Sequence, residues 1–118
     1  ENISDIVKKY KDENWLGIIA ACVAPESYEI IIKELKNLDI PYGFKLNAFK
    51  DIPDDYGVRS PSMWGKGGNP TKILGSRTDI NESKFYEFVK KFKDDGATIL
   101  GGCCEIRPSH INEIAKLK

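Results

Sequence analysis

The chain has 118 residues, which is enough for one domain with one hydrophobic core. Its 18 Lys and Arg residues equal its 18 Asp and Glu residues in number, so no basic excess indicates binding to nucleic acid or to an anionic membrane surface. The longest apolar stretch, 15–25, is much shorter than the roughly 20 residues of a membrane-spanning helix, and the charged N-terminal segment lacks the features of a signal peptide. We therefore expect a soluble, cytoplasmic, single-domain protein.

The first half of the chain alternates between helical and strand patterns. Residues 3–11 have apolar side chains at helical spacing, and WLGIIAACV (15–23) is a continuous apolar run typical of a strand buried on both faces. Pro25 is placed to open a helix, which we expect to end before Pro41 because a residue that precedes proline disfavours the helical conformation. YGFKLNAF (42–49) predicts a second strand.

Residues 50–80 predict a long loop with a short element near 72–74. Loops of this length in compact domains are usually functional or mobile. Within the loop, GKGGNP (65–70) has no preceding strand and no Ser or Thr after its lysine, so we interpret it as a solvated turn rather than a phosphate-binding loop. Met63 and Trp64 have two interpretations, either covering a ligand or packing over the rim of the fold.

Helical and strand patterns alternate again after this loop. Asp79 and Glu82 have the spacing of a capping box, which predicts a helix that ends just before Gly96. ATIL (97–100) predicts a third, short buried strand, and Pro108 opens a last helix. The alternation predicts a parallel α/β sheet, and three strands alone would leave its edges unpaired and one face uncovered. We expect the chain to be part of a larger fold.

Three cysteines are the residues most indicative of chemistry. Cys22 lies at the end of the first predicted strand, and the adjacent Cys103 and Cys104 follow the last strand and the pair Gly101-Gly102. Because consecutive Cα atoms are only about 3.8 Å apart, a disulfide between the two neighbours would be strained. An odd number of cysteines with an adjacent pair is typical of a reducing compartment, where clustered thiols indicate metal binding or catalysis.

The predicted topology brings these cysteines to one edge of the sheet. Ligands of parallel α/β folds bind at the carboxyl ends of the strands, which is where Cys22, Cys103 and Cys104 fall. Three thiolates bind Zn²⁺ well and leave a fourth position open, as in catalytic zinc sites. The alternative is that each cysteine is a small buried apolar residue without a metal.

Three segments resemble the homocysteine S-methyltransferase family. GATILGGCCEIRPSHI (96–111) is similar to its C-terminal Gly-Gly-Cys-Cys-Gly signature, and IIAACVAPESY (18–28) is similar to an upstream segment in which Asn-Cys precedes Pro-Glu. FKLNAF (44–49), which contains Asn47, resembles the segment that the family usually has as Tyr-Pro-Asn-Ala-Gly. The matches follow the family's order along the chain.

The resemblance implies that residues 1–118 form the C-terminal segment of a homocysteine-binding domain, about the last three βα units of a (β/α)8 TIM barrel whose remainder precedes Glu1. It implies zinc held by Cys22, Cys103 and Cys104, and we assign Asn47 to substrate binding. The implied activity is transfer of a methyl group from S-methylmethionine, S-adenosylmethionine, betaine or a methylated folate to homocysteine, giving methionine. The segment does not contain the family's donor-binding motifs, so the donor stays open, as does the oligomeric state.

Several residues depart from the family pattern. Glu105 replaces a usual glycine, Arg107 a usual threonine, and Ala21 the usual asparagine before the first cysteine. These changes keep open a second hypothesis, a non-catalytic zinc- or thiol-binding module that retains the three cysteines. His110, the single histidine, either supports the zinc site from nearby or packs at the start of the last helix, and we favour packing.

Overall fold

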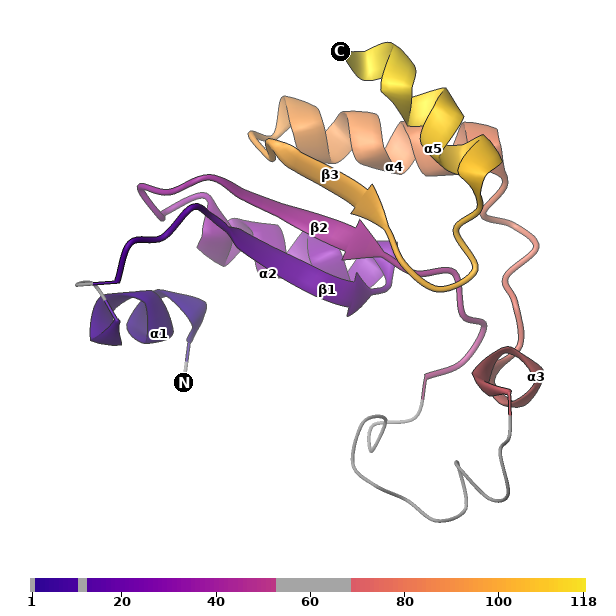
Figure 1. Cartoon of the computed structure of the whole chain (residues 1–118), viewed down its shortest axis with the longest axis horizontal. Coiled ribbons are helices and arrows are strands. Elements are labelled where there is room, and N and C mark those ends of the chain that lie inside the picture. The colour runs from indigo at the N-terminus through magenta and orange to yellow at the C-terminus, as the bar shows by residue number, and fades with distance from the viewer. Residues whose placement is uncertain (1, 11–12, 53–68) are drawn as a thin grey trace.

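The computed structural model describes residues 2–10, 13–52 and 69–118, and Figure 1 shows the course of the chain. In chain order the elements are α1 (Ile3–Lys9), β1 (Ile18–Val23), α2 (Pro25–Leu35), β2 (Tyr42–Leu46), α3 (Pro70–Leu74), α4 (Glu82–Asp94), β3 (Ile99–Gly102), α5 (Pro108–Ile114) and a 3₁₀ helix, η1 (Ala115–Leu117). The predicted alternation of helices and strands is confirmed, including the short element that ends at Leu74. Met63, Trp64 and the first four residues of GKGGNP lie outside the described residues, so their interpretation stays a prediction.

The strands form one parallel sheet in the order β1-β2-β3. Lys45 of β2 is the register partner of Ala21 in β1 and of Gly101 in β3, so these residues form one row across the sheet. Because all strands run in the same direction, the segments that follow β1 and β3 emerge at the same edge, on either side of β2. This small α/β domain with a three-stranded parallel sheet is compatible with part of a barrel.

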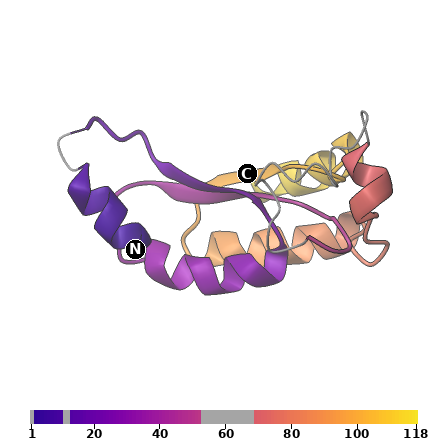
Figure 2. The same ribbon diagram turned by 90° about the horizontal axis from the view of Figure 1, so that it is seen from below.

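Helices α2 and α4 lie on one face of the sheet, as Figure 2 shows. Helix α5 packs against α4, and no helix in the described ranges covers the opposite face of the sheet (Figure 2). Since successive side chains of a strand point to opposite faces, the buried Phe44 and Leu46 face the helices and Lys45 faces the open side. Within the described part of the chain, no helix has the length and apolar character needed to cross a membrane.

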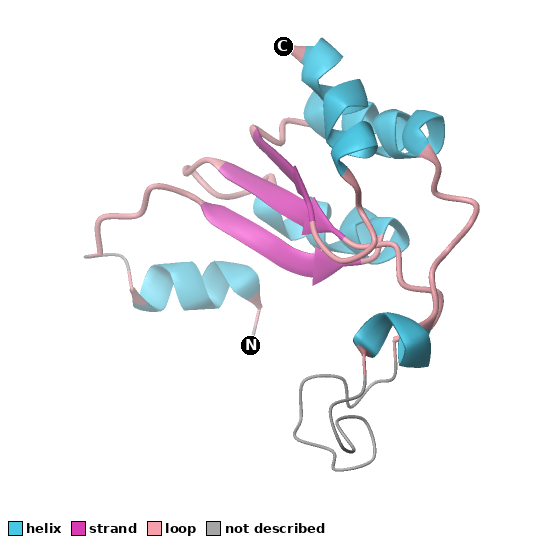
Figure 3. Ribbon diagram, turned by 45° about the vertical axis from the view of Figure 1, so that its right-hand side comes forward, coloured by secondary structure: helices cyan, strands magenta, loops and turns pink. Residues whose placement is uncertain are grey.

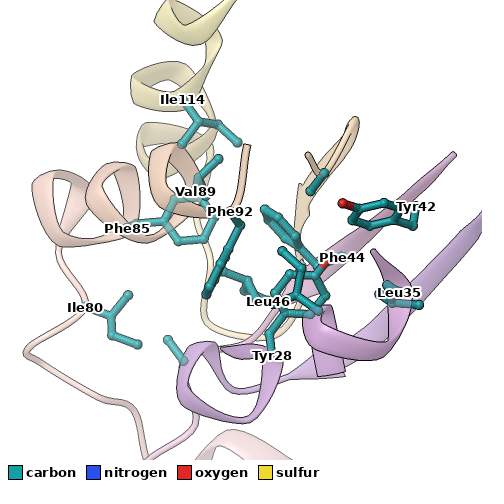
Figure 4. Packing of buried hydrophobic residues seen from close by; sticks show 13 residues of the cluster. Tyr28, Leu35, Tyr42, Phe44, Leu46, Ile80, Phe85, Val89, Phe92 and Ile114 are labelled. Carbon is teal, nitrogen blue, oxygen red and sulfur yellow. The ribbon is translucent and has the colours of Figure 1, made fainter. Parts of the chain in front are cut away.

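The core between the sheet and the helices is built around three aromatic rings (Figure 4). Tyr28 of α2, Phe44 of β2 and Phe92 of α4 have no exposed surface. Their ring centroids are 4.8–5.6 Å apart, with edge-to-face geometry in each pair. Full burial of such a side chain stabilises the fold by about 1.5–3 kcal/mol, so these rings anchor the middle strand to both helices.

Two element boundaries differ from the prediction. Helix α2 ends at Leu35, before the predicted limit at Pro41, because the Asn37 side chain donates to the carbonyl of Lys33 at 3.1 Å and competes with continued helix. Strand β3 covers 99–102 rather than 97–100, since the Ala97 N–H caps α4 by donating to the Phe92 carbonyl. The later start of β3 brings Gly101 and Gly102 into the sheet.

The predicted cap of α4 is wrong by two residues. Asn81, not Asp79, caps the helix, and its side-chain oxygen accepts from the Lys84 N–H at 2.9 Å. Asp79 instead accepts from Arg77, which also forms a two-bond ion pair with Glu26 at the start of α2. The competing partner for Asp79 comes from tertiary structure and has no signal in the local spacing.

The segment that leads from α3 to α4 runs past the side of the sheet where the strands end (Figure 3). An antiparallel bridge joins Phe49 to Ser76, and the Lys50 N–H donates to the Gly75 carbonyl at 2.9 Å. The Arg77 N–H donates to the Ala48 carbonyl at 2.8 Å. These bonds place α3 next to the sheet edge at which the cysteines lie.

Candidate metal centre

Three thiols lie together at the carboxyl edge of the sheet. The Sγ atoms of Cys22, Cys103 and Cys104 are all within 4.8 Å of one another, and we call this group the three-cysteine cluster. The Cys104 Sγ lies 3.9 Å from the Sγ of Cys22 and 3.9 Å from that of Cys103. All three cysteines are free and partly buried. The expectation that the topology brings them to one rim is confirmed.

A bulge at the end of β1 sets the position of Cys22. The register with β2 shifts between Ala21 and Val23, and Cys22 has a φ of +54°. This left-handed conformation costs a residue with a Cβ about 1–2 kcal/mol, and such strain is concentrated at functional sites. The bulge moves Cys22 out of the regular alternation of the strand and toward the segment that follows β3.

The tight turn after β3 sets the positions of Cys103 and Cys104. The Ile106 N–H donates to the Cys103 carbonyl at 3.1 Å, and the Ile106 side chain folds back over Gly102. A Cβ at Gly102 would lie 2.3 Å from the Ile106 Cγ2 atom, which no real contact allows. Glycine at this position is therefore what lets the turn close beneath the adjacent cysteines.

The end of β2 holds both cysteine segments. The Cys103 N–H donates to the Leu46 carbonyl at 2.7 Å, and the Ala48 N–H donates to the Cys104 carbonyl at 3.0 Å. On the other side, the Asn47 N–H donates to the Val23 carbonyl at 2.9 Å. The middle strand thus connects Cys22 to the Cys103-Cys104 pair through backbone hydrogen bonds.

Asn47 is fully buried next to Cys22. Its Nδ2 atom donates to the Cys22 carbonyl at 2.6 Å and lies 3.8 Å from the Cys22 Sγ, while its Oδ1 atom accepts from the Phe49 N–H at 3.2 Å. These contacts make Asn47 a support for the cluster, because a donor that holds a ligand's backbone and sulfur fixes the ligand's orientation. Its assignment to substrate binding stays a prediction.

The thiols influence one another's protonation. Burial and the neighbouring thiols raise the pKa of Cys22 to about 12, and burial also raises the pKa of Cys104. Burial opposes ionisation of Cys103 as well, but hydrogen bonds within the cluster and the positive charge of Lys45 lower its pKa. Cys103 is therefore the thiol that ionises most readily, and a metal that binds all three must displace protons from the other two.

The cluster fits a tetrahedral metal ion. With Zn–S bonds of about 2.3 Å, tetrahedral geometry places neighbouring sulfurs roughly 3.8 Å apart. Two of the three sulfur separations are 3.9 Å, close to this value, and the third is no more than 4.8 Å. Three sulfur ligands and one open position suit zinc, and the soft donor set disfavours the oxygen-binding cations Mg²⁺ and Ca²⁺.

Comparison with protein families places the chain in one family. A family model described as Homocysteine S-methyltransferase matches residues 1–117. The chain belongs to the homocysteine S-methyltransferase family. Membership supports a role in methyl transfer and confirms the resemblance carried by the cysteine segments.

Two curated proteins resemble parts of the chain. Homocysteine S-methyltransferase 3 of Arabidopsis thaliana is 43% identical over 37 residues, which are 31% of this chain and 11% of that protein. Mevalonate kinase of Saccharomyces cerevisiae is 31% identical over 62% of this chain and 18% of the kinase. The chain thus spans less than a fifth of either relative, and the family assignment rests on the match over 1–117.

Glu105 departs from the family's glycine yet keeps a glycine-like backbone. Its φ is +63°, the left-handed conformation that glycine adopts with least strain. Its carboxylate accepts from the Thr71 hydroxyl at 2.7 Å and from the Ser76 hydroxyl, and these two bonds lower its pKa. The substitution therefore ties the turn after Cys104 to α3 and its following segment.

His110 packs in the core, as favoured from the sequence. The ring is 6% exposed and meets Phe85 edge to face, with centroids 5.6 Å apart. Its Nδ1 atom accepts from the Arg107 N–H at 3.1 Å, so the Nε2–H is available to donate to the Ile80 carbonyl 3.0 Å away. Both ring nitrogens are engaged at the start of α5, which leaves neither for a metal.

Replacing Asn47 with alanine is expected to weaken zinc binding about 10- to 100-fold, as loss of a residue that orients a metal ligand typically does. The measurement is a competition titration with a chelator on the full-length protein. Asn81→Ala is the matched control, because it removes the cap of α4, costs about 1 kcal/mol of stability and leaves the cluster intact. Equal zinc affinity in Asn47→Ala and the wild type would show that Asn47 does not support the cluster.

Proposed function

We propose that this chain provides the zinc-binding part of an enzyme that transfers a methyl group to homocysteine and produces methionine. Family membership supports methyl transfer, and the observation that carries the zinc dependence is the three-cysteine cluster at the carboxyl edge of the sheet. Cys22, Cys103 and Cys104 would hold the ion, and the open position would accept the sulfur of the substrate. The proposed fold of the whole domain is a (β/α)8 barrel, of which 1–118 forms about the last three units, in a cytoplasmic protein.

A bound zinc ion would supply Lewis acidity, which lowers the pKa of a thiol so that it reacts as a thiolate at neutral pH. In the overall reaction the acceptor thiol loses its proton, its sulfur gains the methyl group, and the donor leaves without it. The residues of this chain hold and orient the cluster. The Leu46 carbonyl and the Ala48 N–H fix the adjacent cysteines, and Asn47 fixes Cys22.

The test is an assay of methionine formation from homocysteine by the full-length protein, with S-methylmethionine, S-adenosylmethionine, betaine and a methylated folate as donors. We expect turnover with one of these donors. Cys22→Ser, which exchanges a single sulfur for oxygen, is expected to lose that turnover. Zinc analysis is run on the same preparations. One zinc per chain without turnover from any donor would favour the non-catalytic zinc- or thiol-binding module.

A further inference from the structure

Lys45 is an unusual residue for its position in the sheet. It lies in β2, the middle strand, whose sequence YGFKL is otherwise apolar or glycine. Central strands of parallel sheets are usually apolar on both faces, so a lysine in such a strand is uncommon. Lys45 is nevertheless exposed, on the face of the sheet that no described helix covers.

The neighbours of Lys45 leave room for its side chain. Its register partners are Ala21 in β1 and Gly101 in β3, both small. A Cβ built on Gly101 would lie 3.6 Å from the Lys45 Cγ, so the lysine stem lies over the glycine, on the β3 side. Cys103 follows Gly101 by two residues, a distance of about 6–7 Å along a strand.

Among the residues that the structure describes, Lys45 has no carboxylate partner. The salt bridges among the described residues involve other lysines and Arg77. A lysine whose register partner Gly101 lies two residues before Cys103 is suited to bind an anionic part of a ligand held at the three-cysteine cluster.

We propose that Lys45 binds the carboxylate of the substrate whose sulfur occupies the open position at the three-cysteine cluster. This inference rests on the proposed function and narrows the acceptor to thiols that carry a carboxylate a short aliphatic chain away from the sulfur. Such a thiol extends from the cysteines back along the open face of the sheet to the row of Ala21, Lys45 and Gly101. Lys45 would thereby select amino-acid thiols over simple alkyl thiols and amines.

A binding measurement that needs no methyl donor tests this proposal. The full-length protein is loaded with Co²⁺ in place of zinc, and thiol binding is followed by the sulfur-to-cobalt absorption. The probes are homocysteine and 3-aminopropane-1-thiol, which is homocysteine without its carboxylate. Lys45→Met is expected to weaken homocysteine binding about 10- to 100-fold, the range for a lost charged hydrogen bond, and to change binding of the amine thiol less than about twofold.

Two further variants sharpen the result. Lys45→Arg keeps the positive charge and is expected to retain most of the preference for homocysteine. Lys84→Met, on the exposed side of α4, is the matched control and is expected to bind both thiols as the wild type does. If Lys45→Met takes up no cobalt, the two thiols are compared in the wild type. The proposal requires the wild type to bind homocysteine at least about 10-fold more tightly than the amine thiol, and equal affinities would contradict it.

Each alternative has a distinct outcome. Equal weakening of both thiols in Lys45→Met would mean that Lys45 only balances the charge of the cysteines, and the proposal would be wrong. Unchanged binding of homocysteine would overturn it as well. Wild-type protein that binds no metal would overturn the proposed function together with this inference. Normal methionine formation by the wild type, together with unchanged homocysteine affinity in Lys45→Met, would overturn the inference alone.

Discussion

Replacing either Cys103 or Cys104 with alanine is expected to abolish stoichiometric zinc binding. Each substitution removes one of three sulfur ligands, and the remaining pair cannot satisfy a tetrahedral site from protein groups. The fall in zinc affinity should exceed the ~100-fold limit seen when only a supporting residue is lost. Metal analysis of purified full-length protein measures the zinc content, and methionine formation should fall with it.

The control for this result separates ligand loss from loss of folding. Val89→Ala truncates a fully buried side chain of α4 in the core and should destabilise the protein while leaving one zinc per chain. If both cysteine variants also keep one zinc per chain, the cluster is not the metal site. If Val89→Ala loses zinc as the cysteine variants do, the loss reflects general unfolding instead.

Phe44→Ala is expected to produce the largest loss of stability among single substitutions in the sheet, about 3–5 kcal/mol. The Phe44 ring is fully buried between Tyr28 and Phe92, as Figure 4 shows, and its removal leaves a cavity that two helices and a strand cannot readily fill. The measurement is the free energy of unfolding of the full-length protein from urea denaturation, monitored by circular dichroism.

Ile30→Ala provides the comparison for this variant. Ile30 lies on α2 and is 70% exposed, so its truncation should change the free energy of unfolding by no more than about 0.5 kcal/mol. A loss below 1 kcal/mol for Phe44→Ala would mean that the aromatic trio is not the centre of the core.

Much of the fold could be predicted from local patterns. The apolar run before Cys22, the proline that opens α2 and the glycine after α4 each indicate one element, and all three elements are present. The limits of these elements were harder to predict. The α4 cap shifted to Asn81 because Arg77 engages Asp79, and Arg77 is positioned in turn by Glu26, a residue 51 positions away.

The contacts that hold the three-cysteine cluster in place could not be predicted from the sequence. Asn47 could be singled out from its family resemblance, but its bond to the Cys22 carbonyl depends on how β1 and β2 pair. The link from Glu105 to Thr71 and Ser76 joins residues about 30 positions apart. Lys45 gave a weak signal, a charge within an apolar strand, and only the register with Ala21 and Gly101 places it near the cluster.

By itself, the sequence determined that this protein has an alternating α/β pattern, and that Cys22 and the Cys103-Cys104 pair lie at the carboxyl ends of strands in one parallel sheet. These properties are encoded by residue type and short-range spacing, which act before distant segments meet. Only the tertiary structure decided that the three sulfurs lie within 4.8 Å of one another, and that Lys45 of β2 and Asn47 just after it lie between the cysteine segments. The reason is physical: the bulge at Cys22, the turn over Gly102 and the strand register are set by packing and hydrogen bonds between segments far apart in the chain.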